Sequence, residues 1–223
     1  MKNYVNKLLK SDLFTDFTAS EVKQFLDTYH CYPRNFNKGE EIYGPGDVIK
    51  NAGIILSGQI NVIQITSMGR EELVVSEFAG ELIGQAFSIT GQHNSFAHFQ
   101  AATDAEILYL NLHNILVTPS TDTYYIKFIN NITQILASTN IQLNKKIQLL
   151  TQKTLREKLM TYFSQTAAIT GSVHFKMNFT REQLASYVCS ERSSVCRELG
   201  RMQDDGLVIL DGNNVTLCTN LEV

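Results

Sequence analysis

The feature that most restricts the fold is an uninterrupted helical pattern in the middle of the chain. No proline or glycine occurs from Ser120 to Thr170, and apolar residues recur at steps of three and four from Tyr125 to Leu150. Such a helix spans roughly 40 Å at about 1.5 Å per residue, which is more than a small domain needs for its own core. Packing against the chain's own N-terminal domain accounts for the first two turns only. We therefore expect the rest to pair with a second copy of the helix.

The residues expected at this dimer interface lie on the apolar face of the long helix. They are Ile129, Ile132, Leu136, Thr139 and Leu143. A three-four repeat suits coiled-coil packing, and two-fold pairing is the commonest form of assembly.

Three patterns in succession divide the chain. The first pattern is helical spacing near the start, where Ser20 before Glu21 predicts the start of a helix. The second, between Tyr32 and Leu112, is a series of short apolar runs separated by turn signals. Many short strands at even spacing predict a double-sheet roll. We therefore predict an α+β protein with three parts: a jelly-roll β-roll domain with N-terminal helices over 1–120, a dimerisation helix over 121–150 and a C-terminal domain over 151–223.

Composition excludes several classes of protein. Hydrophobic residues make up 43% and charged residues 18% of the chain, as in an ordinary folded protein. The sequence has no run of about 18 apolar residues and no signal-peptide pattern at its start, so we expect a cytoplasmic protein with no membrane partner. Its four cysteines, Cys31, Cys189, Cys196 and Cys218, contain no CxxC pair, which argues against a zinc ribbon.

The most informative motif runs from Phe179 to Met202. Ala185, the bend after it and Val195 occur at the spacing of two short helices that cross tightly, a helix-turn-helix. Val195, Leu199 and Met202 share one face of the second helix. The opposite face carries Arg192, Ser193, Cys196, Arg197 and Gly200. Small residues with projecting arginines suit the floor of a DNA major groove, where arginine can donate two bonds to guanine O6 and N7.

Charge gives this interpretation only modest support. The net charge is −3, from 19 Lys and Arg against 22 Asp and Glu, although basic residues outnumber acidic ones five to three between Lys176 and Arg201. The alternative is a solvated face on which the motif's arginines pair with Glu191 and Glu198. The helix before the turn and the hairpin predicted around Asp211-Gly212 favour DNA binding, because that hairpin would form a wing.

An ordered set of glycines completes the pattern. They are Gly39, Gly46, Gly58, Gly69, Gly80 and Gly84, with the segment Gly80-Glu81-Leu82-Ile83-Gly84 and, after the helix-turn-helix, Asp205-Gly206-Leu207-Val208. On these residues, from about Leu8 to Leu217, the chain resembles the cyclic-AMP receptor protein and fumarate-nitrate regulator (Crp/Fnr) family of bacterial transcription regulators. The resemblance implies a cyclic-nucleotide-binding-like roll, a homodimer and a winged helix-turn-helix. It also implies an inverted-repeat operator, RNA polymerase as a partner and no enzymatic activity.

The resemblance assigns DNA contacts residue by residue. It places Thr180 and Arg181 at phosphate-contacting positions and Arg192, Ser193 and Arg197 at base-reading positions. Well-known members carry glutamate where this chain has Ser193, which predicts a half-site that keeps a guanine opposite Arg197 but differs nearby.

Two cysteines in the same motif raise a second possibility. Cys189 stands where the family commonly has glycine, so a positive φ there would cost some strain. Cys196 lies beside the reading residues, where oxidation would add bulk and charge against DNA. A thiol-redox-responsive regulator acting through Cys189 or Cys196 is therefore an alternative function, against the simpler view that Cys196 is a small residue suited to close groove approach.

The roll departs from the family's nucleotide pocket. The family uses a glutamate for the ribose and an arginine followed by a serine for the phosphate, and these positions here are Gln85, Ser95 and Phe96. No lysine or arginine occurs from Glu71 to Ile126, and a buried phosphate without a cation is costly. We expect a small-molecule effector other than cyclic AMP, bound near these residues and Gln142, or a vestigial pocket.

Histidine spacing argues against a metal or haem. His93 and His98 lie five apart, and the chain offers no closely spaced His-x-His pair. The sulfur-cluster version of the family needs several N-terminal cysteines, whereas only Cys31 is available. We therefore expect no cofactor, no metal site and no catalytic residue; a metal-dependent enzyme built on the roll is the remaining alternative.

Overall fold

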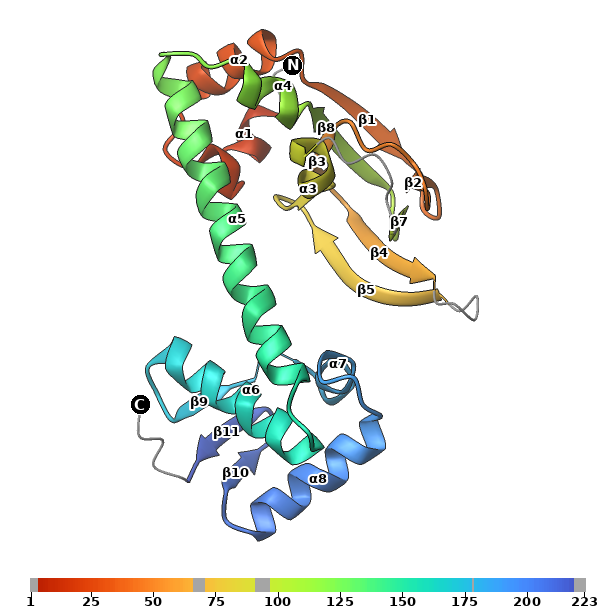
Figure 1. The fold of residues 1–223 in the computed structure, drawn as a ribbon, viewed down its shortest axis with the longest axis vertical. Coiled ribbons are helices and arrows are strands. Elements are labelled where there is room, and N and C mark those ends of the chain that lie inside the picture. Colours follow the sequence, from red (N-terminus) through yellow and green to blue (C-terminus); the bar gives the residue numbers. More distant parts are fainter. Residues whose placement is uncertain (1–3, 66–70, 91–96, 178, 219–223) are drawn as a thin grey trace. The chain divides into compact units, whose positions relative to one another are not determined.

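The computed structural model describes residues 4–65, 71–90, 97–177 and 179–218. The chain divides into two compact units, Met1–Leu136 and Ala137–Val223 (Figure 1). The α+β class is confirmed, with a β-rich first unit, a long helix and a helix-turn-helix in the second. Among the described residues, no helix combines the length and apolar character needed to cross a bilayer.

Short helices begin the first unit. They are α1 (Val5–Leu8), a 3-10 turn η1 (Asp12–Phe14) and α2 (Ala19–Thr28). The start of α2 was wrongly predicted at Ser20. Thr18 caps the helix instead, because its hydroxyl accepts the Glu21 N–H while the Glu21 carboxylate accepts the Thr18 N–H. A capping box joins the N-cap residue to the residue three positions later. Thr18 stands three positions before Glu21, whereas Ser20 stands next to it.

Two four-stranded antiparallel sheets form the roll (Figure 1). One sheet has the order β1 (Tyr32–Phe36), β8 (Ala105–Leu110), β3 (Ala52–Ser57) and β6 (Leu82–Ile83). The other has the order β2 (Glu41–Tyr43), β7 (Ala97–Ala101), β4 (Gln59–Ile65) and β5 (Glu71–Phe78). Gly58 joins β3 to β4 with φ +91°, and a Cβ there would lie 2.4 Å from the Asp104 carbonyl oxygen. Only glycine fits that turn.

Two further short helices precede the long helix: α3 (Gln85–Thr90), between β6 and β7, and α4 (Leu112–Val117), after β8. The sequence pattern predicted only strands up to Leu112, so α3 was missed. Its anchor is the buried Ser88, whose hydroxyl donates to the Lys50 carbonyl at 2.9 Å and accepts the Leu112 N–H at 3.2 Å. These bonds come from distant segments, whereas the local sequence, with Phe87 and Ile89, has the composition of a strand.

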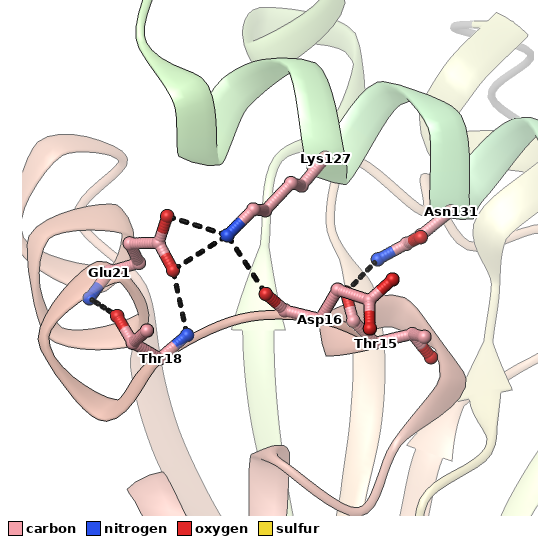
Figure 2. Close-up of polar contacts among 6 residues, drawn as sticks. All are labelled: Thr15, Asp16, Thr18, Glu21, Lys127 and Asn131. Atoms are coloured by element: carbon pink, nitrogen blue, oxygen red, sulfur yellow. Dashed lines mark hydrogen bonds and ion pairs between the residues drawn. The ribbon is translucent and has the colours of Figure 1, made fainter.

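The long helix α5 (Thr123–Leu150) is anchored to the N-terminal helices at its start (Figure 2). Lys127 Nζ lies 2.7 and 2.9 Å from the carboxylate oxygens of Glu21 and 2.8 Å from the Asp16 carbonyl. Asn131 Nδ2 donates to the carbonyls of Leu13 and Thr15, each at 3.0 Å. The hydrogen bond from Lys127 lowers the pKa of Glu21 to about 2. The first turns of α5 are therefore fixed within the first unit.

The second unit contains three helices and a three-stranded sheet of order β10-β11-β9 after the end of α5. Its elements are α6 (Leu155–Thr170), β9 (His174–Lys176), α7 (Arg181–Tyr187), α8 (Arg192–Asp204), β10 (Val208–Asp211) and β11 (Asn214–Leu217). α6 begins with a second capping box, Thr154 with Glu157, and ends at Gly171, whose φ is +64°. β10 and β11 form the predicted hairpin through a two-residue turn, with Gly212 first at φ +57°.

Candidate nucleic-acid interface

The helix-turn-helix is built from a capped helix and a left-handed turn. Thr180 caps α7: its hydroxyl accepts the Gln183 N–H, and the Gln183 side chain accepts the Thr180 N–H. Ala185 is buried, as predicted, and its carbonyl accepts the Ser190 N–H at 2.9 Å across the turn. Cys189 lies within that turn with φ +52°, so the non-glycine strain considered above is present.

The two faces of α8 differ sharply. Val195, Leu199 and Met202 are buried in the core of the second unit. The opposite face is exposed and carries Arg192, Ser193, Cys196, Arg197 and Gly200. No atom outside the helix lies within 4 Å of a Cβ built on Gly200. This face is therefore short, polar and uncovered within its own unit.

Two carboxylates near this face, Glu198 and Asp205, are held by other arginines. Arg156 Nε lies 2.6 Å from Glu198 Oε1, and its Nη1 lies 2.6 Å from Asp205 Oδ2. Arg201 approaches the second oxygen of Glu198 at 3.6 Å. The alternative pairing of Arg197 with Glu198 is thus not formed, because α6 and α8 share that carboxylate instead.

Arg192 and Arg197 consequently have no intramolecular partner among the residues that the structure describes. Both side chains are exposed, and within the described part of the chain neither forms a hydrogen bond or an ion pair. Two guanidinium groups, five residues apart on one helix, are free to meet an external acceptor. Guanine edges and phosphate oxygens are the acceptors that suit them.

Arg181 has a structural contact that the sequence pattern did not reveal. Its Nη2 donates to the Gly212 carbonyl at 3.0 Å, and its Nη1 lies 3.5 Å from the sulfur of Met177. The half-buried guanidinium therefore connects the start of α7 to the turn of the wing hairpin. A separation of 31 residues between Arg181 and Gly212 left no local signal for this bond.

Lys146 is a second residue that sequence reasoning missed. Its ammonium donates to the backbone carbonyl of Tyr187 and lies 3.5 Å from the centre of the Tyr187 aromatic ring. Burial of this group lowers the pKa of Lys146. The contact joins the last turns of α5 to the end of α7, immediately before the turn that leads into α8.

The residues proposed for an effector are only partly described. Gln85 begins α3 and is half-buried, Gln142 is exposed on α5, and Ser95 and Phe96 lie outside the described residues. Gln85 belongs to the first unit and Gln142 to the second. Inside the roll, Tyr43 makes edge-on ring contacts with Phe99 and Tyr109 at 6.0 and 6.2 Å.

The thiols differ from one another in burial. Burial raises the pKa of Cys31 to about 12, while Cys189 and Cys196 are exposed. His98 Nε2 lies 3.0 Å from a carboxylate oxygen of Glu41, and His93 is outside the described residues. Among the described residues, no group of three or more His, Cys, Asp or Glu side chains is placed to hold a metal ion.

The exposed stripe of α5 differs from the predicted dimer interface. Ile132 is 2% exposed and belongs to the core of the first unit, so its side chain is covered by its own chain. Ile129 and Thr139 are half-buried, and Leu136 and Leu143 are exposed. Large apolar side chains not included in the prediction are also exposed on this helix: Ile126, Ile141 and Ile147.

Both parts of the chain match known sequence families. Residues 33–117 match the cyclic nucleotide-binding domain, and residues 147–221 match the Crp-like helix-turn-helix domain. Electron transport regulator A of Shewanella oneidensis is 26% identical over 211 residues, covering 92% of this chain and 82% of that protein. The fumarate and nitrate reduction regulatory protein of Escherichia coli K12 is 26% identical over 218 residues, covering 94% and 84%.

Solved structures agree on the fold. The c-di-GMP responsive global regulator CLP of Xanthomonas campestris matches with a TM-score of 0.59 and 18% identity, over 91% of this chain and 100% of that one. The catabolite activator protein of Thermus thermophilus matches with a TM-score of 0.55 and 22% identity, over 93% of each chain. The relatives are named as regulators, which confirms the prediction of a regulator and not an enzyme. With both domains matched in order, the chain belongs to the Crp/Fnr family of DNA-binding transcription regulators.

Proposed function

We propose that this protein acts as a homodimer whose two α8 helices read the halves of an inverted-repeat operator. In this arrangement, residues 1–120 sense an effector, residues 121–150 pair the two copies and residues 151–223 contact DNA. Two-fold symmetry of the protein requires two-fold symmetry of its site, with half-site centres about one helical turn, roughly 34 Å, apart.

The observation that carries this proposal is the freedom of Arg192 and Arg197. Both are exposed on one face of α8, while Glu198 is paired with Arg156 and Arg201, and Asp205 with Arg156. An arginine without an internal partner keeps all its donors for the base edge.

Each proposed DNA contact follows from its place in the motif. Arg197 reads a guanine, with Arg192, Ser193 and Cys196 beside it on the same exposed face. The Thr180 and Arg181 positions face phosphates, and the bond from Arg181 to the wing gives that guanidinium a fixed position. Ser193 cannot accept from a cytosine amine as strongly as a glutamate, so the half-site sequence differs from those read with glutamate.

The proposed effector is a small molecule other than cyclic AMP. The roll offers no lysine or arginine between Glu71 and Ile126 to neutralise a cyclic phosphate. Gln85, Ser95, Phe96 and Gln142 remain the proposed contacts. Binding of the effector would change how two α5 helices pack, and this would change the separation of the two α8 helices. RNA polymerase is the proposed protein partner, and the cytoplasm is the proposed location.

Selection from random-sequence DNA tests the proposal. The full-length protein should enrich an inverted repeat with a guanine in each half-site, and Arg197→Ala should lose discrimination against replacement of that guanine. Arg34→Ala, in the first unit and outside α8, serves as the matched control and should bind as the wild type does. Enrichment of no palindrome, or an Arg197→Ala variant with unchanged sequence preference, would contradict the proposal.

A further inference from the structure

A heptad repeat runs along one side of α5. Positions at alternating steps of three and four are Ile126, Ile129, Thr133, Leu136, Asn140, Leu143, Ile147 and Leu150. In coiled-coil terms the a positions are Ile, Thr, Asn and Ile, and the d positions are Ile, Leu, Leu and Leu. Three of the four a residues are branched at Cβ and three of the four d residues are leucine, which is close to the pattern of a parallel two-stranded coiled coil.

Several of these seam residues are uncovered in the single chain. Ile126 is 52%, Leu143 58% and Ile147 58% exposed, although each is large and apolar. No charged residue occurs from Phe128 to Asn144. The helix therefore lacks the flanking charge pairs by which many coiled coils select partner and alignment. The choice of partner and the alignment of the two helices must therefore come from the a and d residues of the seam.

Asn140 is the seam residue with an unmet polar group. Thr133, the other polar position, donates its hydroxyl to the Ile129 carbonyl at 2.7 Å and so has no unpaired donor. Asn140 Oδ1 accepts from Asn144 Nδ2 at 2.8 Å. The amide N–H groups of Asn140 have no acceptor among the described residues. They need one once the seam is covered.

We propose that Asn140 pairs with the partner's Asn140 across the seam and thereby fixes a parallel, in-register, two-stranded dimer. The inference rests on the proposed homodimer and adds the residue that selects its partner. In register, each amide lies opposite the same amide, so one Nδ2 donates to the other Oδ1. A shift by one heptad places the Asn140 of one chain against Thr133 and that of the other chain against Ile147, and the amide opposite isoleucine stays unsatisfied. Only the in-register pair places both reading helices at the same distance from the two-fold axis.

Pairing between unlike chains tests this residue directly. Tagged wild-type protein is mixed with untagged Asn140→Ile, equilibrated and captured by the tag, and the untagged fraction of partners is measured by mass spectrometry. In a mixed dimer the wild-type Asn140 amide would be buried opposite isoleucine without an acceptor. Asn140→Ile chains should therefore make up less than about one tenth of the partners captured with the tagged wild type. Gln134→Ile makes a similar change in polarity at an exposed position off the seam and should supply about half, as random pairing requires.

Sedimentation equilibrium gives a second readout. The polar layer costs stability, so the Asn140→Ile homodimer should dissociate with a constant at least about tenfold lower than the wild type, with Gln134→Ile unchanged. Asn140→Val offers a second branched apolar variant with the same expectation. Asn140→Ile chains that pair freely with the wild type, or form no tighter dimer, would overturn the inference. A wild-type protein that is monomeric at all concentrations would instead overturn the proposed dimer.

Discussion

At the scale of single residues, the reading motif depends on a few side chains whose neighbours leave them free or hold them fixed. Glu198 pairs with Arg156 and not with the exposed Arg197, and Arg181 is fixed because Gly212 offers a carbonyl. Cys189 adopts a left-handed backbone conformation to keep the turn between α7 and α8 sharp. Geometry at this motif is therefore maintained at some local cost in stability.

The turn residue gives a first prediction. Cys189→Gly should raise the stability of the protein by up to about 1 kcal/mol, because glycine removes the left-handed strain but gains freedom in the unfolded chain. Cys189→Ala keeps the left-handed strain, so its free energy of unfolding should be close to that of the wild type. Urea unfolding followed by circular dichroism measures both. A Cys189→Gly variant no more stable than Cys189→Ala would show that the turn stores no strain.

Glu77 gives a second prediction through pH. Burial, followed by its hydrogen bond with Glu81, raises the pKa of Glu77 to about 7. Because ionising it in the folded state is harder than in the unfolded chain, stability falls as pH rises from the ordinary value of 4.5 through about 7. Glu77→Gln should abolish that fall, so the variant is more stable than the wild type at pH 8 and similar to it at pH 4. Parallel pH profiles of urea midpoint for the two proteins measure the effect, and profiles that coincide would contradict it.

At the scale of elements, local pattern predicted what is local. The three-four repeat predicted α5, the turn signals predicted the roll, and Asp211-Gly212 predicted the wing. The features that local pattern missed depend on contacts between residues far apart in the sequence. Ser88 stabilises α3 through Lys50, and Lys146 reaches Tyr187 across 41 residues. Periodicity carries no information about such pairs.

The same limit applies to the candidate site and the dimer face. The exposed arginines of α8 follow from helical periodicity with Val195 and Leu199 buried, whereas the wing contact of Arg181 does not. The apolar stripe of α5 was predicted, but not which of its residues serve the first unit's own core. Ile132 is buried because the N-terminal helices cover one side of the first turns of α5.

The anchor at the start of α5 gives a third prediction. The pKa of Glu21 is lowered to about 2, chiefly by the hydrogen bond from Lys127. The pair therefore contributes stability above the ordinary pKa of 4.5, and this contribution is lost as pH falls toward 2. Lys127→Met should reduce stability at pH 7 and make it fall less steeply between pH 4.5 and 2.

A neighbouring lysine provides the control for that experiment. Lys23 is exposed on α2, so Lys23→Met removes the same charge without breaking the Glu21 pair. Its urea midpoint should follow the wild-type profile across the acid range. Equal acid sensitivity of the wild type and Lys127→Met would mean that the pair shown in Figure 2 does not stabilise the fold.

At the scale of the whole molecule, one continuous helix carries both the proposed pairing surface and the connection to the helix-turn-helix. The seam runs along α5, and Lys146, near the end of that helix, contacts Tyr187 before the turn into α8. We propose that a change in how two α5 helices pack is passed to α8 through this contact. Pairing and DNA reading should therefore fail together when the seam is broken.

Breaking the seam gives a fourth prediction. Leu143→Asp places a charge at a d position of the coiled coil, which should raise the dimer dissociation constant at least about a hundredfold. Binding to the inverted repeat should weaken with it, while the circular dichroism spectrum stays unchanged. Gln134→Asp adds the same charge at an exposed position off the seam and should leave both measurements near wild type.

Methylation interference on the selected operator is the most direct measurement of whether two α8 helices read one site. We predict that methylating guanine N7 blocks binding at one position in each half-site, about one helical turn apart, and that Arg197→Ala abolishes the effect at both positions together. Interference at a single position, or a pattern that Arg197→Ala leaves intact, would contradict paired reading by this arginine.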